Sequence, residues 1–406
     1  MSTKRRIQNS HLEMVRSNNT LKILKILLQS EPLSRMDISK ITGLSPTTVT
    51  SIIEKLIRSG WLYEGDEGIS NGGRKPIMLK INRNSRYILG VQITGKLIKG
   101  AIYNLEPTEV FRIERKVSRL GKTIIDLLYE VTDGLMEHVK AGQLEALALC
   151  LNVPGVVNVK SGLLIYATDL ELENIKFKEI LEKRYKIDVY VQNDANLAAL
   201  AEKTYGIAKN ENMVIYIKDL GGAGIIINGD IYIGSNGAAG ELGHISIEKN
   251  GEKCKCGNYG CLYQYVSAMA IEANAIKAIK QGTDTELNQI VESDFNKVTL
   301  ETIIELANKG DNFSRQLIKN AGENLGVGIV SLVNILDIRF IVIGGAFTKA
   351  GDYFYQKVID TFRSRTSKMS FKNIRIEKSG LTQDIGLLGC VCMVLNETFK
   401  IPFVNN

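Results

Sequence analysis

Hydrophobic residues recur with helical spacing in the first sixty positions of the chain, and the pattern changes to short apolar runs near residue 87. Residues 19–29 (NTLKILKILLQ) predict a first helix. The apolar stripe expected for this helix comprises Leu21, Leu24, Ile26, Leu28 and their neighbours. Ser34, with Asp37 three residues later, has the spacing of an N-cap and predicts a second, short helix. That helix is expected to bury Ile38 and Ile41.

A third helix is predicted after the turn Thr42-Gly43-Leu44, where Gly43 is free to take a left-handed conformation. Ser45 is its expected N-cap, and Pro46 suits the first turn because no backbone N–H is needed there. The apolar residues of this helix share one face, at spacings of three and four: Val49, Ile52, Ile53, Leu56 and Ile57.

The opposite face of the third helix begins with short hydroxyl side chains, Thr47, Thr48, Thr50 and Ser51. Such side chains let a backbone approach DNA closely and bond base edges or phosphates. Two strand-like runs follow, the second being Pro76–Ile81, and residues 71–75 (NGGRK) between them form a basic tip. This order predicts a winged helix-turn-helix domain over residues 1–83. Its expected DNA contacts are Arg35, Ser45, Thr47, Thr48, Thr50, Ser51, Arg74 and Lys75.

The charge distribution supports that interpretation over a module that only packs or dimerises. Residues 1–86 contain 15 lysines and arginines against 7 acidic residues, whereas the rest of the chain has 36 against 37. The formal net charge of +7 therefore comes entirely from the first fifth of the sequence. A basic excess confined to one domain is typical of a domain that meets a polyanion.

From residue 87 onward, apolar runs alternate with helical stretches, which predicts an α/β architecture. The clearest strand candidates are Tyr87–Ile93, Ala146–Leu151, Met213–Ile217 and Phe340–Gly345. Glycine-rich turns follow several of them, but such turns are common in any α/β domain. The length of 406 residues suggests about three compact units in all.

One histidine and three cysteines gather within eighteen positions: His244, Cys254, Cys256 and Cys261. This set has the ligand count and types of a closed, tetrahedral structural Zn²⁺ site. Gly257 and Gly260 give the intervening turn its backbone freedom. The alternative is a set of buried, inert cysteines, and the clustering of four of the nine His and Cys side chains favours zinc.

The remaining cysteines (Cys150, Cys390 and Cys392) lie in apolar surroundings and are interpreted as reduced core residues, although Cys390 and Cys392 have the spacing of a redox pair. No run of eighteen apolar residues occurs, and the start MSTKRRIQNS lacks the apolar core of a signal peptide. A cytoplasmic location without membrane contact is therefore expected.

Several segments together resemble the ROK family (repressors, open reading frames and kinases), and most of all its regulators of the xylose-repressor type. The segments are SRMDISKITGLSPTTVTSIIEKLIRSGWL, GGRKPIMLKIN, VPGVV, QNDANLAALAE, GIIINGDIYIG, GAAGELGH, CKCGNYGCL and IVIGGA. They span nearly the whole chain, and the most specific are GELGH and CKCGNYGCL, the second of which we call the cysteine knuckle.

The resemblance implies an actin-like pair of α/β lobes with a sugar between them, after the winged helix. It implies a first lobe of residues 84–195 plus 382–406 and a second lobe of residues 196–381, the last helix returning to the first lobe. By position, the sugar contacts would be Asn193, Asp194, Glu241 and His244. His244 would bind zinc through one ring nitrogen and offer the other to a sugar hydroxyl.

Two departures from the family's pattern concern phosphate binding. The family's kinases carry an Asp-x-Gly-Gly-Thr loop after the first strand, where this chain has Gln92-Ile-Thr-Gly95. In the second phosphate loop Asp219 brings an acid and the usual Thr is missing. A carboxylate beside ATP would repel its phosphates, by ~1 kcal/mol or more. Asp194 stands where the kinases keep their general base, but a base without a held phosphoryl donor has nothing to catalyse.

The third departure is Tyr263, two residues after the last zinc cysteine, where the family commonly has Glu. The tyrosine either stacks on a sugar or packs against the knuckle, and the sequence leaves both open.

The leading hypothesis is a sugar-responsive repressor of a carbohydrate operon, with xylose or a related sugar as effector, double-stranded operator DNA as partner, and a homodimer or homotetramer as assembly. The alternatives are an ATP-dependent hexose or hexosamine kinase with an appended DNA-binding domain, and a regulator that answers to a protein or a phosphorylated sugar.

Overall fold

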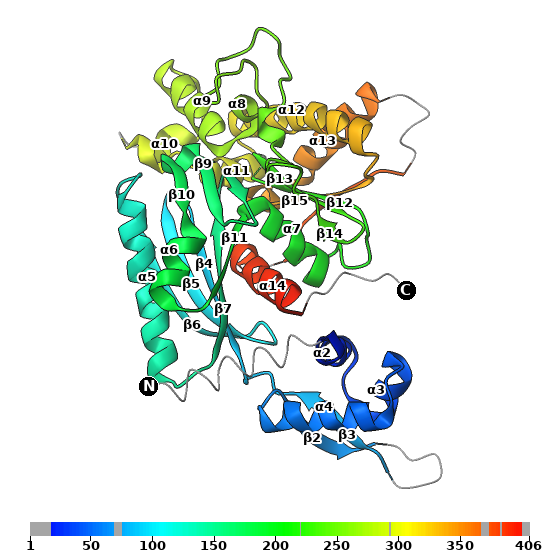
Figure 1. Ribbon diagram of the computed structural model, residues 1–406. Coiled ribbons are helices and arrows are strands. Elements are labelled where there is room, and N and C mark those ends of the chain that lie inside the picture. Colours follow the sequence, from blue (N-terminus) through cyan, green and yellow to red (C-terminus); the bar gives the residue numbers. More distant parts are fainter. Residues whose placement is uncertain are drawn as a thin grey trace.

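The computed structural model describes residues 18–68, 75–219, 221–291, 294–366, 373–381 and 384–399. A small N-terminal unit lies at one end of the molecule, next to a larger α/β unit (Figure 1). The elements of the small unit are α2 (Asn18–Ser30), β1 (Leu33–Ser34), α3 (Arg35–Thr42), α4 (Pro46–Arg58), β2 (Leu62–Glu67) and β3 (Ile77–Ile81).

The predicted caps of the small unit are confirmed. Ser34 and Asp37 form a reciprocal capping box at the start of α3, and the Ser45 side chain accepts a hydrogen bond from the Thr48 N–H of α4. Gly43 ends α3 with φ 71°, in the left-handed region. The strands form a sheet in the order β1-β3-β2, so helix, turn, helix and wing strands follow one another as predicted.

The buried face of the small unit differs from the prediction in all three helices, since Ile52 and Ile57 of α4 are half-buried rather than buried. In α2 the innermost residues include Ile23 and Leu27, while Ile26 and Leu28 are half-buried. Ile41 was predicted to be buried and is instead 55% exposed. The cause is that α3 is a short helix whose last inward position is Thr42. The Thr42 hydroxyl bonds the Ile38 carbonyl oxygen at 2.6 Å.

The first sheet of the large unit has the order β11-β7-β4-β5-β6. Its strands are β4 (Tyr87–Ile93), β5 (Leu97–Asn104), β6 (Glu109–Lys116), β7 (Ala146–Val153) and β11 (Asp188–Asn193). Strand β4 runs parallel to β7 and antiparallel to β5, so the sheet is mixed. Helices α5 (Thr123–Ala141) and α6 (Phe177–Tyr185) pack on it. A second, small sheet contains β8 (Val156–Asn158), β9 (Leu163–Ala167) and β10 (Leu172–Lys176), with the short helix η1 (Thr168–Leu170) between the last two.

The other large sheet has the order β14-β13-β12-β15-β16. Its strands are β12 (Val214–Lys218), β13 (Gly222–Ile227), β14 (Asp230–Ile231), β15 (Phe340–Gly344) and β16 (Arg375–Lys378). The helices of this half are η2 (Leu242–His244), α8 (Tyr263–Val266), α9 (Ala268–Lys280), α10 (Leu287–Val291), η3 (Phe295–Lys297), α11 (Leu300–Lys309), α12 (Asn312–Leu336), η4 (Gly345–Lys349) and α13 (Asp352–Arg365).

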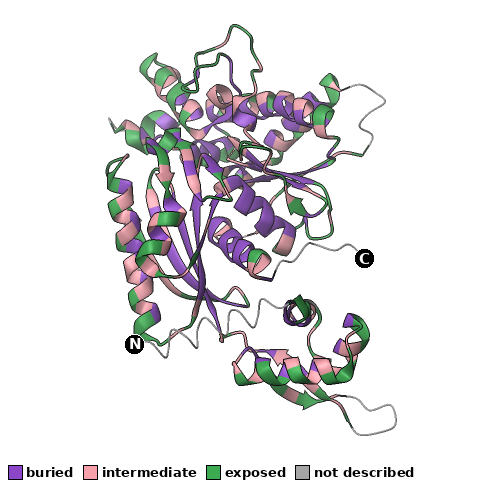
Figure 2. Ribbon diagram, in the orientation of Figure 1, coloured by how far each residue is buried: buried purple, intermediate pink, exposed green. Residues whose placement is uncertain are grey.

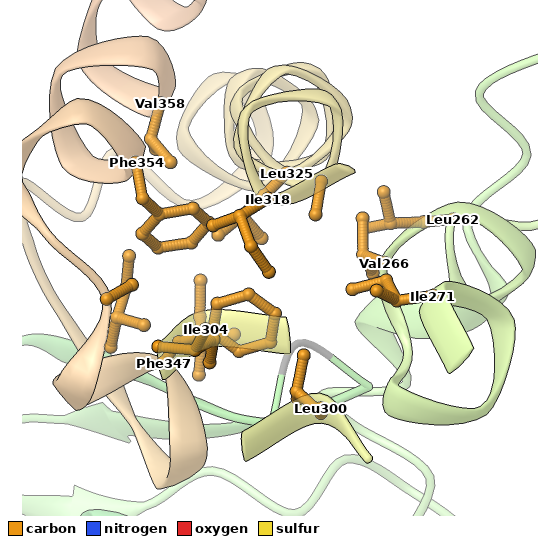
Figure 3. Packing of buried hydrophobic residues seen from close by; sticks show 14 of the residues in the cluster. Leu262, Val266, Ile271, Leu300, Ile304, Ile318, Leu325, Phe347, Phe354 and Val358 are labelled. Atoms are coloured by element: carbon orange, nitrogen blue, oxygen red, sulfur yellow. The ribbon is translucent and has the colours of Figure 1, made fainter. Parts of the chain in front are cut away.

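A continuous apolar core fills the space between these helices. Phe347 and Phe354 stack with ring centroids 4.9 Å apart, and Leu262 enters the same core directly after Cys261, the last cysteine of the predicted zinc site (Figure 3). The cysteine knuckle is therefore anchored to the interior by its next residue.

Two helices lie between the large sheets (Figure 1). Helix α7 (Asp194–Tyr205) packs against β12 and β13 of one sheet, and α14 (Ile385–Phe399) packs against β4 and β7 of the other and against α7. Both helices are buried along most of their length (Figure 2). The last helix thus returns to the first sheet, as the resemblance implied. The division of the chain at residues 195 and 381 stays a prediction.

The core of the small unit continues into the large one. One cluster of buried side chains joins α2 and α4 to α14, and it includes Cys150, Cys390 and Cys392. All three cysteines are buried with free thiols. None of the helices in the described ranges combines the length and apolar character of a membrane span.

Candidate functional site

The N-terminus of α4 presents a row of hydroxyl groups. Ser45 Oγ lies 2.9 Å from Thr47 Oγ1 and 2.8 Å from Thr48 Oγ1. Thr47 and Ser51 are exposed, whereas Thr48 and Thr50 are half-buried. The positive end of a helix dipole favours an anion at this place. The arrangement therefore suits contact with a DNA phosphate or base edge.

Two of the cations predicted to contact DNA form ion pairs with acidic residues of β2. Arg35 Nη2 lies 2.7 Å from Glu64 Oε1, and Lys75 Nζ lies 3.7 Å from Glu67 Oε2. Exposed ion pairs of this kind contribute only about 0–1 kcal/mol to the stability of the fold. A polyanion such as DNA can therefore compete with the acids for these cations. Arg74 lies outside the described residues.

Three further cations on the same helices were not among the predicted contacts. Lys40 is exposed in the last turn of α3, and Lys55 and Arg58 are exposed in the last turns of α4. The signal was present in the sequence, because these positions fall outside the apolar stripe of their helices.

The four predicted zinc ligands do come together. One ligand atom from each of His244, Cys254, Cys256 and Cys261 lies within 4.8 Å of the others. Cys256 Sγ is 3.7 Å from Cys261 Sγ, and Cys254 Sγ is 3.8 Å from His244 Nδ1. Zinc–sulfur bonds of about 2.3 Å in a tetrahedron place sulfur ligands about 3.8 Å apart. The residues therefore fit a Zn²⁺ ion.

The local chain is shaped for this cluster. Gly257 and Gly260 have φ of 95° and 62°, which other residues rarely adopt, and a side chain at Gly260 would collide with the Glu248 carbonyl oxygen. Burial, and then the neighbouring thiols Cys256 and Cys254, raise the pKa of the Cys261 thiol. A thiolate at that buried position therefore needs a cation beside it.

His244 connects the cysteine cluster to the predicted sugar contacts. Its Nδ1 faces Cys254, and its Nε2 lies 3.8 Å from Glu241 Oε2. Burial lowers the pKa of His244, so the neutral imidazole is favoured at pH 7. One ring nitrogen thus faces the thiols and the other faces Glu241, and the contact of His244 with a sugar hydroxyl stays a prediction.

Asn193 and Asp194 lie at the junction of β11 and α7. The Asn193 side chain is the N-cap of α7, because its Oδ1 accepts from the N–H groups of Ala195 and Asn196. Its Nδ2 donates to the Gly155 carbonyl oxygen at 2.9 Å, which leaves one N–H of that amide to donate to a ligand. The role of Asn193 that the structure shows is to cap α7. Its contact with a sugar stays a prediction.

Asp194 forms an ion pair with Lys218, a residue that the sequence reasoning missed. Lys218 ends β12, and its Nζ meets Asp194 Oδ2, while Asp194 Oδ1 accepts from the Ala195 N–H at 2.9 Å. Burial alone would lower the pKa of Lys218, but Asp194 and Asp219 outweigh burial and raise it above the usual value. No sequence periodicity links these two residues, since they meet only when the sheets are assembled.

Burial, and then the Asp194 charge, raise the pKa of Glu241. Asp194 and Glu241 therefore share one electrostatic environment, in which Lys218 balances part of the negative charge. We call Asp169, Asp194, Lys218, Glu241, His244 and Tyr263 the junction cluster.

Tyr263 reaches from the cysteine knuckle to the small sheet on the other side. Its hydroxyl donates to Asp169 Oδ2 at 3.2 Å, and its ring lies 6.2 Å from the His244 ring at 25°. A Cβ atom at Gly221 or Gly243 would touch the ring at 3.2–3.3 Å, so glycine at both positions leaves room for it. Asp169 was also missed from the sequence.

The position corresponding to the first phosphate loop is filled by amides. Gln92 pairs with Asn152 in the register of β4 and β7, and both are buried. Among the described residues, no group bonds Gln92 Oε1 or the Asn152 amide. A Cβ atom at Gly386 would lie 2.6 Å from Gln92 Nε2, so the start of α14 closes directly over these amides.

The opposite end of α14 meets the DNA-binding unit. Phe399 and Trp61 form an edge-to-face pair with ring centroids 5.9 Å apart. The Arg86 guanidinium lies 4.8 Å from the Trp61 ring centre, and it also pairs with Glu145 at 2.8 Å. We call Trp61, Arg86, Glu145 and Phe399 the domain joint.

These features define a class of protein: a winged-helix DNA-binding domain joined to a two-lobed α/β unit that gathers polar groups and a cysteine–histidine cluster between its lobes. Residues 16–63 match the model of winged helix-turn-helix DNA-binding domains, and residues 88–397 match the ROK family model. The chain belongs to the ROK family, and among its members to the transcriptional regulators with an N-terminal winged helix.

Individual relatives agree with this. The xylose repressor of Caldicellulosiruptor bescii is 30% identical over 96% of this chain and 98% of its own length. The transcriptional dual regulator NagC of Escherichia coli is 29% identical over 92% of this chain and 91% of its own. The crystal structure of a ROK family regulator described as a homologue of the E. coli MLC protein superposes with a TM-score of 0.81 at 25% identity, covering 95% of this chain and 98% of that one.

A ROK glucokinase from Streptomyces griseus, in complex with glucose and AMPPNP, superposes with a TM-score of 0.66 at 24% identity. It covers 76% of this chain and 98% of its own length, and at that identity the likeness concerns the fold alone.

Proposed function

We propose that this protein is a sugar-responsive transcriptional repressor of a carbohydrate-use operon, with xylose or a related sugar as its effector. It binds double-stranded operator DNA through the winged helix, acts in the cytoplasm where that DNA is, and is released when the sugar binds at the junction cluster. The observation that carries the proposal is that Asp194, Glu241 and His244 meet beside the cysteine cluster, while α14 runs from that region to the winged helix.

The chemistry of the junction cluster suits a saccharide. Carboxylates accept hydrogen bonds from paired hydroxyl groups. Lys218 adds N–H donors, and the His244 Nε2 atom donates or accepts according to the tautomer of the ring. A site built to bond particular hydroxyl groups rejects an epimer, because buried polar groups are then left unpaired. This chain is almost equally similar to relatives named xylose repressor and N-acetylglucosamine repressor. Overall identity therefore does not decide which sugar binds, and the side chains of the junction cluster must do so.

The proposed route of coupling is α14. Its first turn covers Gln92 and Asn152 near the lobe junction, and its last residue, Phe399, touches Trp61. A sugar that binds Asp194 on one lobe and Glu241 on the other favours one arrangement of the lobes over another. A shift of α14 would then change the angle of the winged helix. A coupling of about 1–3 kcal/mol weakens operator binding roughly 5- to 150-fold.

Repression also requires two winged helices at a fixed spacing, since half-sites are read in pairs. We therefore propose a homodimer or homotetramer. The sugar then acts by changing the spacing of the two winged-helix domains in the oligomer.

We propose that the protein is not a kinase. Lys218 holds the carboxylate of Asp194, the residue at the position of the general base. Asp219 lies where a nucleotide's phosphates would approach, and its Oδ1 accepts from the Ala346 N–H at 2.9 Å. A carboxylate fixed at that point repels a phosphoryl donor.

The test uses the full-length, zinc-replete protein and DNA fragments from the promoter next to its gene. Fluorescence anisotropy at fixed salt would follow release of the fragment as pentoses and hexoses are added. We expect one sugar to weaken binding at least fivefold. Equal operator affinity with every sugar would contradict the proposal, and sugar-dependent release of ADP from ATP would establish the kinase instead.

A further inference from the structure

The outward face of α4 carries one acidic side chain among hydroxyl groups and cations. The helix buries Val49, Ile53 and Leu56 on its inner side. The exposed residues on the opposite side are Thr47, Ser51, Glu54, Lys55 and Arg58. Their exposure is that of the full chain, so the described part of the large unit leaves this face of α4 uncovered.

Glu54 differs from the other acids of the small unit because it has no partner. Its carboxylate forms no ion pair with any residue that the structure describes. Arg58, one helical turn further on, donates from Nε to the Glu54 carbonyl oxygen at 3.3 Å instead. The acids of the described small unit that do have side-chain partners are Glu31, Asp37, Glu64, Asp66 and Glu67.

An unpaired carboxylate on a face that meets DNA has few possible partners. It only accepts hydrogen bonds, and phosphate oxygens carry the same sign of charge. The donors that the bases present in the major groove are the amino groups N4 of cytosine and N6 of adenine. Adenine N6 stands next to the acceptor N7, which repels a carboxylate, whereas cytosine has only a C–H group beside N4. Cytosine is therefore the base that suits Glu54.

The position of Glu54 on α4 agrees with a base contact. Thr47, Ser51, Glu54 and Arg58 follow one another at spacings of four, three and four, which places them in one stripe along the helix. A rise of 1.5 Å per residue puts Glu54 about 10 Å beyond Thr47, about the height of three base pairs. The hydroxyl groups of Thr47 and Ser51 both donate and accept, so they discriminate less between bases than a carboxylate does.

We propose that Glu54 reads a cytosine in the major groove and thereby determines part of the operator sequence. This inference rests on the proposed binding of operator DNA through α4, and it adds the base that one side chain selects. The Glu54 carboxylate accepts a hydrogen bond from the cytosine N4 amino group. Guanine and thymine at the same place present acceptor atoms, O6 and N7 or O4, which repel the carboxylate. In a two-fold symmetric complex the cytosine occurs once in each half-site.

The experiment is selection of bound duplexes from a pool of random sequence by the full-length, zinc-replete protein at fixed salt. Fluorescence anisotropy then compares the selected duplex with its single-base variants. We expect the wild-type protein to prefer cytosine by at least about fivefold at one position of each half-site. Glu54→Ala should lose the preference at that position alone. Glu54→Gln should move it to adenine, because a Gln amide pairs with adenine N6 and N7. Ala and Gln are both good helix formers, so α4 should stay intact.

The matched control is Glu137→Gln, which makes the same charge change at an exposed position of α5 and should leave the selected sequences unchanged. If Glu54→Ala binds every duplex more tightly by the same factor and keeps the wild-type preference, Glu54 only repels phosphates and the inference is wrong. The proposed function would stand in that case. Failure of the wild-type protein to enrich any sequence would instead reject the proposed binding of operator DNA.

Discussion

The predicted DNA-binding surface of the winged helix and the predicted sugar site of the junction cluster are built in opposite ways. The hydroxyl groups predicted to read DNA come from one stretch, residues 45–51, held by two caps and a glycine turn. The junction cluster takes its groups from segments around residues 169, 194, 218, 241 and 263, on both lobes. A site made from one helix keeps its shape when neighbouring domains move. A site shared between lobes changes its shape when they move, which suits the sensor role that we propose for the junction cluster.

The largest expected effect tests whether the sensor depends on the metal. Cys261→Ser replaces a fully buried ligand, and we expect zinc affinity to fall at least 100-fold and the sugar response to disappear, because His244 loses its fixed orientation. Operator affinity without sugar should stay within about threefold. Metal content by mass spectrometry and anisotropy measure the two effects.

The control is Cys392→Ala, a buried cysteine of α14 that belongs to no metal cluster in the described part of the chain. It should keep its zinc. A Cys261→Ser protein that loses its metal and still responds to sugar would separate the sensor from the zinc site.

The second prediction tests the domain joint. Phe399→Ala should destabilise the protein by about 3–5 kcal/mol, as is typical when a buried Phe is truncated, and should abolish release of the operator by sugar. Chemical denaturation and anisotropy measure these effects. Phe362→Ala makes the same change in the core of the second lobe, so it should cost similar stability and preserve the response. An equal loss of response in both variants would show that stability alone is at issue.

The third prediction separates helix capping from DNA reading. Ser34→Ala and Ser45→Ala each remove an N-cap side chain, so each should lower stability by about 1 kcal/mol. Only Ser45 stands at the start of the predicted reading helix. Its substitution should also weaken operator binding about 5- to 10-fold at fixed salt. Equal operator affinities of the two variants would move the DNA contact away from α4.

The smallest effect concerns the wing. Lys75→Ala removes one exposed cation, so operator affinity should fall only about two- to fivefold, while the slope of log affinity against log salt should become shallower by about 0.9. Lys309→Ala, an exposed lysine in the second lobe, should leave the slope unchanged. A wild-type slope in Lys75→Ala would mean that this lysine meets no phosphate.

The contrast also explains how much the sequence could predict. The sequence predicted the helix caps, the glycine of the turn and the order of the helices in the winged helix correctly. Each of these features is determined by residues only three or four positions apart. The four predicted zinc ligands are likewise close in sequence, and the structure brings them together. Ile41 was predicted wrongly, since periodicity does not show where a short helix ends against its neighbours.

Lys218 and Asp169 were missed for a different reason. Each meets its partner across a large sequence distance, and nothing local distinguishes Lys218 from the chain's other lysines. The meeting of Lys218 with Asp194 requires β12 and α7 to be in place. Physical chemistry explains why an ion pair is stable there, but only the assembled fold says which residues form it.

Helix α14 is the last element of the described chain, and it occupies the centre of the molecule. Ribosomal synthesis delivers residues 385–399 after all the other strands and helices of the described ranges. The winged helix can therefore form early, whereas its contact with α14 must wait until residues 385–399 have been synthesised. A copy terminated before residue 385 would carry the winged helix without α14, and its Trp61 would lack the ring of Phe399.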